Sequence, residues 1–418
     1  MKIKTLSDNG LLTFYACISC VAVLPLYIHW LPPFMILWGI LWIFENRKGF
    51  DNMSIDGNKP VILFILFLSF FLWNTGGLLL SDSLNSGFER IFRRLSILLF
   101  PLVLFYPGSK IKSNIPFILR VFSIGVFIYL VYCFGNALHN SLVYKDGNWV
   151  FNAYHELYTY ENFFMGARLS SIVHPSYLSM YVLLSALISL NSFFDSERPL
   201  FKRYIWFAAA IFFTLVIYLL SSRAGVLAAF IVLSLYFIFK FYRKVSKGVI
   251  VVVLIVAGLG SATMLKTNER FKYSLEELSQ SGINEAFSND TRFLIWKSAF
   301  GVIKSNFLLG VGTGDASEEL KKEFLNRGYV DGYYDNLNAH NQFIEVLLEN
   351  GIIGLIIFLA IIGYLGYSAI YERNLLLGLF LLMMVIFFMF ETVLNRLAGI
   401  TFFPLFAFLL LYWKDALK

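Results

Sequence analysis

The chain has 418 residues, of which 58% are hydrophobic, 18% are aromatic and only 15% are charged, and its net charge is +7. Roughly a quarter of the residues of a soluble domain are charged, so this composition excludes an ordinary soluble protein and predicts a polytopic membrane protein. Cytoplasmic loops rich in Lys and Arg explain the positive charge, which is therefore no sign of nucleic-acid binding. Cys17, Cys20 and Cys133 lie inside apolar runs, which favours buried thiols over a disulfide framework or a metal site.

Apolar runs follow one another along almost the whole chain. A membrane-spanning helix needs about 20 apolar residues, and most of these runs meet or approach that length. They predict an all-α integral membrane protein with about 12 transmembrane helices, forming a single polytopic domain over residues 1–418. The predicted spans are 11–28, 31–44, 61–80, 91–106, 115–138, 172–194, 204–220, 224–241, 249–265, 352–371, 375–390 and 397–413.

The distribution of Lys and Arg between the runs predicts the orientation of the chain. The short connections on one side of the predicted membrane, together with both termini, are rich in Lys and Arg, and such segments stay in the cytoplasm. The two long polar connections, 139–171 and 266–350, then lie on the external side, the second as a helical region between the ninth and tenth helices. The sequence contains no nucleotide-binding domain, so a cytoplasmic reaction with ATP or a nucleotide sugar is not expected.

Several arginines stand at the predicted outer ends of helices, where a charge is costly unless it faces a cavity or a partner. Guanidinium groups form bidentate hydrogen bonds to phosphate oxygens, so a ring of them suits an anionic lipid head group. A pair between Arg396 and Glu391, or extension of Arg90 to the membrane interface, is the structural alternative. The candidates for this ring are Arg90, Arg93, Arg94, Arg168, Arg223 and Arg396, with His174 as a further polar contact.

The stretch 292–355 combines two residues with complementary chemistry. His340 precedes one amphipathic run, and Arg292 opens another. A neutral imidazole accepts a proton near neutral pH, whereas a guanidinium group stays charged and binds phosphate. The pair indicates chemistry on a phosphorylated substrate at a membrane surface.

The remaining polar residues of this stretch have simpler interpretations. The GVGTGD segment lacks the lysine of a phosphate-binding loop, so we predict a tight turn in which Asp315 caps a helix over 317–326. Glu345 and Glu349 lie one helical turn apart and are predicted to form a solvated helix face, with orientation of His340 as the alternative. The acidic residues show no metal-binding spacing.

From His174 onward, the chain resembles the O-antigen ligase and polymerase superfamily. The resemblance rests on SSRAG, NDTRFLIWKSAF, LLGVGTG, AHNQFIEVLLENGIIGL and ETVLNRLAGITFFPLFAFLL. It implies a membrane glycosyltransferase of the GT-C-like kind that uses no metal or other cofactor. Ligases of this family transfer a glycan from undecaprenyl diphosphate to a sugar hydroxyl of lipid A–core on the periplasmic face of the bacterial inner membrane. The implied partners are this donor, this acceptor and membrane lipids, without nucleic acid.

The resemblance also implies roles for individual residues. Arg223 and Arg292 match arginines thought to hold the diphosphate, and His340 matches the essential histidine, with Asn341 beside it as a possible substrate contact. With His340 as the base and the diphosphate as the leaving group, one direct displacement predicts inversion at the anomeric carbon. The arginines at 90, 93 and 94 match no motif of the family, and the argument for them is electrostatic.

Three alternatives stay open at this point. An O-antigen polymerase would join one repeat unit to another; polymerases often show an Arg, ten residues and then a Gly, and no Arg here has Gly at that spacing. A protein O-oligosaccharyltransferase of the same superfamily would accept a Ser or Thr hydroxyl. A transporter or flippase would need charged residues scattered through the helices, whereas here the charge collects on one predicted face.

Overall fold

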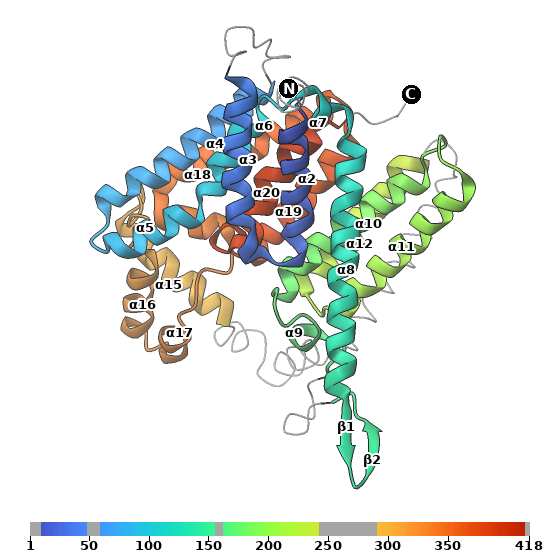
Figure 1. The fold of residues 1–418 in the computed structure, drawn as a ribbon. Helices are drawn as coiled ribbons and strands as arrows, with labels where there is room; N and C mark the ends of the chain where they lie inside the picture. Colours follow the sequence, from blue (N-terminus) through green and yellow to red (C-terminus); the bar gives the residue numbers. More distant parts are fainter. Residues whose placement is uncertain (1–9, 48–58, 155–161, 242–290, 414–418) are drawn as a thin grey trace. The chain divides into compact units, whose positions relative to one another are not determined.

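The computed structural model describes residues 10–47, 59–154, 162–241 and 291–413, which are mostly helical (Figure 1). The predicted span 249–265 lies outside these residues. The chain divides into two compact units. Unit 1 comprises Met1–Asn9, Trp38–Lys112 and Ser274–Lys418, and unit 2 comprises Gly10–Leu37 and Ser113–Tyr273.

Within the described residues, 7 helices are long and apolar enough to cross a membrane by length and composition. The coarse prediction of an all-α, multi-pass membrane protein is therefore confirmed, while the number of twelve spans and the GT-C-like arrangement stay predictions. The seven helical stretches are Ile28–Asn46, Lys59–Leu80, Ile115–Ser141, Pro175–Phe193, Leu200–Leu219, Arg223–Phe241 and Gln342–Tyr371, and the shorter apolar helices are Leu11–Leu26, Leu375–Phe390 and Leu397–Leu411.

Unit 1 has an apolar helical core and a polar end. In the core, α18 packs against α4 and α19, and α20 packs against α6 and α19. The phenylalanines of α20 are buried among those of α4 and α19, as the contacts of Phe403 with Phe67 and Phe380 illustrate. The elements of unit 1 are α4 (Lys59–Gly76), η3 (Gly77–Leu80), α5 (Leu84–Arg93), α6 (Leu95–Leu104), α7 (Ser109–Ser113), α15 (Thr291–Ser305), α16 (Ala316–Asn326), α17 (Val330–Tyr334), α18 (Gln342–Tyr371), α19 (Leu375–Phe390), η4 (Val393–Asn395) and α20 (Leu397–Leu411), with α3 (Leu31–Asn46) entering from unit 2.

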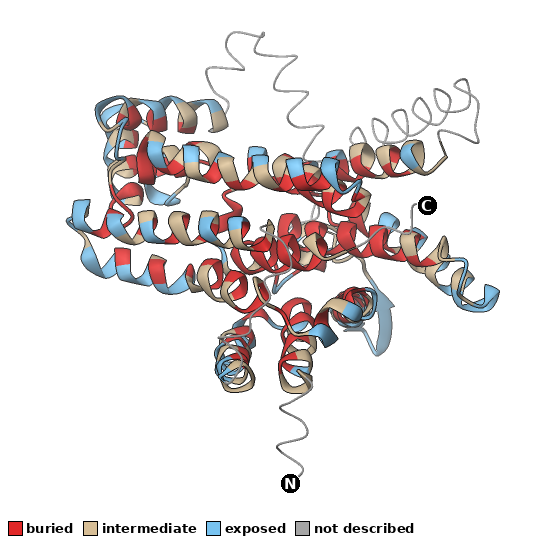
Figure 2. Ribbon diagram, turned by 90° about the horizontal axis from the view of Figure 1, so that it is seen from above, coloured by how far each residue is buried: buried red, intermediate tan, exposed pale blue. Residues whose placement is uncertain are grey.

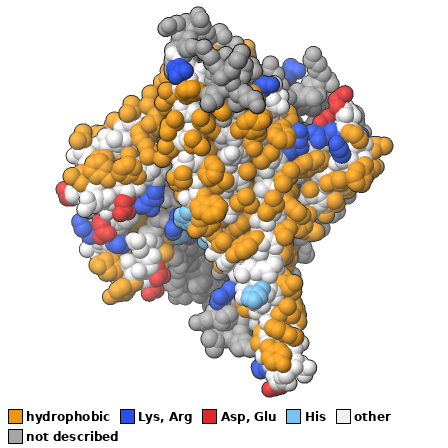
Figure 3. Space-filling view, viewed as in Figure 1, with side chains coloured by type: hydrophobic (Ala, Val, Ile, Leu, Met, Phe, Trp, Pro, Cys, Tyr) orange, Lys and Arg blue, Asp and Glu red, His pale blue; other side chains and the backbone are white. Residues whose placement is uncertain are grey.

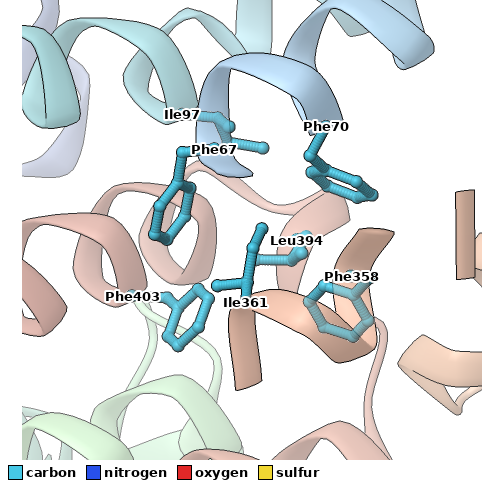
Figure 4. Close-up of a pocket in the computed structure, with 7 residues that line it drawn as sticks. All are labelled: Phe67, Phe70, Ile97, Phe358, Ile361, Leu394 and Phe403. Atoms are coloured by element: carbon cyan, nitrogen blue, oxygen red, sulfur yellow. The ribbon is translucent and has the colours of Figure 1, made fainter. Parts of the chain in front are cut away.

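A small apolar gap lies between α4, α6, α18 and α20 in this core (Figure 4). The side chains around it point toward one another, leave no room for a water molecule and are all apolar. The gap is therefore a feature of core packing, because a substrate site needs polar groups to orient its ligand. Its lining residues are Phe67, Phe70, Ile97, Phe358, Ile361, Leu394 and Phe403.

The predicted span 91–106 is interrupted. α5 ends at Arg93 and α6 begins at Leu95, so two helices of 10 residues replace one long helix. Such a helix rises only about 15 Å, half the thickness of a bilayer core. Arg94, at the break, is 5% exposed, and its guanidinium group is bound by side chains from other elements. Those tertiary contacts explain why this apolar run, which the sequence predicts as one transmembrane helix, is interrupted.

A second interruption divides α18. The predicted span begins at residue 352, but the helix starts at Gln342 and is broken at Gly351, where φ is 63° and ψ is −169°. The segment before α16 supplies hydrogen-bond donors to the carbonyls at the break. The amides of Val311 and Gly312 donate to the carbonyls of Leu348 and Glu349 at 3.0 and 3.1 Å. A Cβ at Gly351 would collide with the Leu308 carbonyl, so only glycine fits there.

Unit 2 is a group of apolar helices. α10 packs against α8, α11 and α12, and is buried along nearly its whole length, whereas α11 exposes large apolar side chains such as Tyr204, Ile211 and Leu215. Figure 2 shows this division between buried and exposed faces along the helices. Exposed apolar faces of this size are what lipid-facing helices require. The elements of unit 2 are α2 (Leu11–Leu26), η1 (Ile28–Trp30), α8 (Ile115–Ser141), β1 (Leu142–Lys145), β2 (Asn148–Phe151), α9 (Gly166–Leu169), α10 (Pro175–Phe193), α11 (Leu200–Leu219) and α12 (Arg223–Phe241).

A β-hairpin at the end of α8 departs from the all-α prediction (Figure 1). β1 and β2 pair antiparallel, with Lys145 opposite Asn148. The two residues between them, Asp146 and Gly147, have φ values of 51° and 82°, as the commonest two-residue hairpin turn requires. The sequence Lys-Asp-Gly-Asn, between alternating Val, Tyr and Trp residues, carries this signal, which the prediction of a polar connection over 139–171 overlooked.

Candidate active site

Charged and polar side chains of unit 1 gather at the end formed by α5, α15, α16 and the start of α18. In the space-filling view, Lys, Arg, Asp and Glu collect over the region of α5 and α16, while apolar side chains cover most of the rest of that face (Figure 3). The described part of the predicted polar region, 291–350, is helical as expected. Its helices share a small core in which Ile295, Phe324 and Leu348 are buried, so the polar end is a packed structure.

His340 occupies the turn that leads into α18. Its φ is 44°, a left-handed conformation that costs a non-glycine residue about 1–2 kcal/mol. The Asn338 side chain accepts a hydrogen bond from the His340 amide at 3.0 Å, and the Asn341 side chain caps α18 by accepting from the amides of Phe343 and Ile344. The histidine is therefore held by its two asparagine neighbours, and Asn341 has a structural role besides its predicted substrate contact.

The backbone of Ala339, the residue before His340, is fixed from two sides. The Trp296 indole of α15 donates to the Ala339 carbonyl at 2.9 Å, and the Ala339 amide donates to the Glu345 carboxylate at 3.1 Å. Ala339 itself is fully buried. The backbone at the histidine thus has fixed partners on α15 and α18.

The imidazole of His340 faces a carboxylate. Its Nδ1 lies 3.6 Å from Oε2 of Glu391, and 34% of the His340 side chain is exposed. A carboxylate on one ring nitrogen selects the tautomer that leaves the other nitrogen free to accept a proton. A separation of 3.6 Å is too long for a hydrogen bond, and catalytic contacts often shorten only when substrate binds. Glu391 was predicted only as a possible partner of Arg396, so sequence reasoning missed its position beside the histidine.

Arg292 lies near the same end of α19. Its guanidinium carbon is 5.4 Å from the centre of the Phe390 ring, and Phe390 immediately precedes Glu391. Arg292 also stands one helical turn before Trp296, so both side chains lie on the face of α15 that meets the histidine turn. Within unit 1, Arg292 and His340 thus each contact the end of α19, at Phe390 and Glu391 respectively.

Arg90 and Arg94 have a different environment. Both guanidinium groups bind the carboxylate of Glu349, which is 1% exposed, and Arg94 reaches it at 2.6 Å. Arg90 also donates to the hydroxyl of Ser317. The prediction that Glu345 and Glu349 form a solvated helix face is wrong, because both are buried and each is bound by groups from other elements.

Asn395 connects the Glu345 carboxylate with Arg94, which binds the Glu349 carboxylate. Its amide nitrogen donates to Glu345 at 2.6 Å, and its amide oxygen accepts from Arg94 at 3.0 Å. Arg94 further donates to Asn74 of α4. A continuous buried network thus runs from α4 and α5 through η4 to the carboxylate that holds the histidine turn.

Two further predicted residues lie at the edge of this end. Arg93 is exposed and faces only the equally exposed Glu89, 3.7 Å away, while Arg396 is an exposed residue that begins α20. Asp315 stands at the start of α16 but makes no side-chain cap there. Its carboxylate instead accepts from the amides of Asp82 and Ser83 at 2.7 and 2.9 Å, which corrects the predicted cap and ties α5 to the glycine-rich turn.

The predicted residues of unit 2 gather at one end of that unit. Arg223 begins α12, and the hydroxyl of the preceding Ser222 lies 3.4 Å from that of Ser176 in the first turn of α10. His174 caps α10 by accepting from the Ser176 amide at 3.4 Å. Arg168 belongs to α9, whose first residue approaches Ser221. The two arginines and the histidine are therefore neighbours within unit 2.

No group of three or more metal-binding side chains occurs among the described residues. All three cysteines are free and buried. The absence of a cofactor stays a prediction. The residues that sequence reasoning missed are Trp296, Glu391 and Asn395, of which Glu391 and Asn395 share the ETVLN motif and Trp296 belongs to NDTRFLIWKSAF.

Comparison with known families gives a match to part of the chain. Residues 208–359 match the family model described as O-Antigen ligase, an interval that contains Arg223, Arg292 and His340. A search of curated proteins gives no match to the chain.

Proposed function

Because the chain belongs to the O-antigen ligase and polymerase superfamily, we propose that it transfers a glycan from undecaprenyl diphosphate to a sugar hydroxyl of lipid A–core. The reaction takes place at the periplasmic face of the bacterial inner membrane and uses no metal. One observation carries the proposal: an imidazole with a carboxylate at one nitrogen lies at the same end of α19 as a guanidinium group. A base and a fixed positive charge are the two groups that displacement of a diphosphate needs.

His340 acts as the general base. Glu391 faces Nδ1, so Nδ1 carries the proton and Nε2 is free to accept one. The acceptor hydroxyl oxygen attacks the anomeric carbon and gives its proton to Nε2. The bond between the anomeric carbon and the diphosphate oxygen breaks, and undecaprenyl diphosphate leaves with that electron pair. This single displacement inverts the configuration at the anomeric carbon.

Arg292 stabilises the charge that grows on the leaving diphosphate. A guanidinium group presents two parallel N–H donors to phosphate oxygens and stays charged at any physiological pH. The Phe390 ring beside Arg292 adds a cation–π contact that holds the guanidinium group in place. Arg223 has the same role by the motif it matches, and Arg93, Arg168, His174 and Arg396 are proposed substrate contacts.

The test is transfer by the purified protein in nanodiscs, with an undecaprenyl-diphosphate-linked glycan and lipid A–core. The expected product is lipid A–core that carries the glycan, and His340→Gln should abolish its formation. Extension of the lipid-linked donor by further repeat units would identify a polymerase, and transfer to a Ser or Thr of a peptide would identify a protein glycosyltransferase. Movement of intact donor across the bilayer without transfer would identify a flippase.

A further inference from the structure

The buried network behind the histidine has no place in the chemistry described so far. It contains two carboxylates, Glu345 and Glu349, and two guanidinium groups, of Arg90 and Arg94. Both arginines already have a buried carboxylate as partner. A diphosphate would have to displace Glu349 from both of them and leave its charge in a water-free site, which is strongly unfavourable.

Glu345 ends the network at the histidine turn. One carboxylate oxygen accepts from the Ala339 amide and the other accepts from Asn395. Each oxygen of the carboxylate therefore has its own donor, one on the histidine turn and one on η4. Asn395 is itself oriented by Arg94, since its oxygen accepts from the guanidinium group and its nitrogen then points to Glu345. Arg94 therefore orients the Asn395 amide, and Asn395 in turn orients the Glu345 carboxylate.

The histidine needs this support because its backbone conformation is unfavourable by itself. A residue at φ 44° persists only where its surroundings determine it, and here the preceding residue, Ala339, is held at both its N–H and its C=O. Release of the Ala339 amide would let the turn relax and would move the imidazole away from Glu391. Misplacement of a catalytic group by about 1 Å costs on the order of a hundredfold in rate.

We propose that Glu345 is a positioning residue for His340, and that Arg94 and Glu349 act through Asn395 to hold it. Arg90 and Arg94 then serve the architecture of the site rather than the donor diphosphate, contrary to the electrostatic prediction. The inference rests on the proposed function, because it assigns His340 as the base whose position matters.

The decisive variant is Glu345→Gln, which keeps the shape of the side chain but replaces one acceptor with a donor. Hydrogen exchange of the Ala339 amide should become about tenfold faster, since its acceptor is weakened. The kcat of glycan transfer should fall about 10- to 100-fold, with the KM for the lipid-linked donor within about twofold of wild type. Glu318→Gln, on the exposed face of α16, is the matched control and should change none of the three.

Two further variants separate positioning from folding and from donor binding. Trp296→Phe removes the donor to the Ala339 carbonyl and should lower kcat in the same way, so the proposal stays testable if Glu345→Gln fails to fold. Arg94→Lys keeps the charge beside Glu349 but loses the fork that reaches Asn395, and should lower kcat without raising the donor KM.

Unchanged exchange at Ala339 in Glu345→Gln, an unchanged kcat, or a raised donor KM in Arg94→Lys would each overturn the proposal. If the wild-type protein transfers no glycan to any acceptor, the proposed function fails instead. The exchange measurement needs no substrate, so it still decides whether Glu345 holds the turn.

Discussion

Arg94 and Arg292 show how differently the same residue type can be used within unit 1. Arg94 is buried at the break between α5 and α6, where its charge is balanced by Glu349 and its N–H groups are bound by two asparagines. Arg292 is half-buried at the start of α15, over an aromatic ring and close to the end of α19 that bears Glu391. Charge at a predicted membrane boundary therefore does not by itself identify a substrate-binding arginine; the depth of burial and the nature of the partner separate the two.

The largest effect is expected where both groups of residues converge, at His340. His340→Gln removes the base but keeps a polar side chain of similar size, and should lower kcat by about 10²–10⁴-fold because general-base catalysis contributes that much. Transfer to lipid A–core, followed by gel mobility, measures it. Glu318→Gln, on the exposed face of α16, is the control. Glycan transfer at the wild-type rate by His340→Gln would show that His340 is not the general base.

Removal of the carboxylate between the buried arginines should affect stability. Glu349→Gln leaves two guanidinium groups without their counter-charge, and we expect the free energy of unfolding to fall by about 3 kcal/mol. Thermal unfolding in detergent measures the change. Glu319→Gln, whose partner Lys322 is exposed, should leave the unfolding temperature nearly unchanged. Equal melting temperatures for Glu349→Gln and wild type would show that burial of this network was overestimated.

Arg292 should behave in the opposite way. Arg292→Ala should lower the free energy of unfolding by less than Glu349→Gln does, because Arg292 is only half-buried and its contact with the Phe390 ring is worth about 1 kcal/mol. Its kcat/KM for the lipid-linked donor should fall about 10²-fold, as expected for one group that stabilises a leaving charge. Competition with inorganic diphosphate gives an independent measure of anion binding. If Arg292→Ala lowers the unfolding temperature but transfers glycan normally, Arg292 has a structural role like that of Arg94.

The smallest effect sharpens the comparison between neighbours on α5. Arg93 adjoins Arg94 in the sequence but is exposed, and its partner Glu89 is exposed as well. Arg93→Ala should change the free energy of unfolding by less than about 0.5 kcal/mol, because exposed ion pairs contribute little. The same unfolding assay checks this. A loss as large as that of Glu349→Gln would mean that Arg93 has a partner which the ion pair with Glu89 does not explain.

The sequence predicts those parts of the molecule that depend on local composition. Long apolar runs such as 115–138 and 204–220 form helices because backbone bonding and side-chain hydrophobicity agree there. The same reasoning predicts roles for Arg292 and His340, whose motifs are local. It failed at Arg94 and at Glu345, because the break in one helix and the burial of the other side chain depend on partners far away in the sequence. The predicted helix cap by Asp315 is wrong for the same reason, since its carboxylate accepts from a backbone amide just before α5, more than two hundred residues earlier.

The break at Gly351 also fixes the register of α18. The carbonyls of Leu348 and Glu349 are bound by the glycine-rich turn, and the Ile352 amide donates back to Phe307 at 2.9 Å. A shift of the break by one residue would strand these groups and rotate the first turns of the helix by about 100°, carrying Glu345 away from Asn395. Insertion or deletion of a single residue between His340 and Gly351 would therefore be far more damaging than most substitutions there. The number of residues between these two positions determines whether Glu345 can reach Asn395.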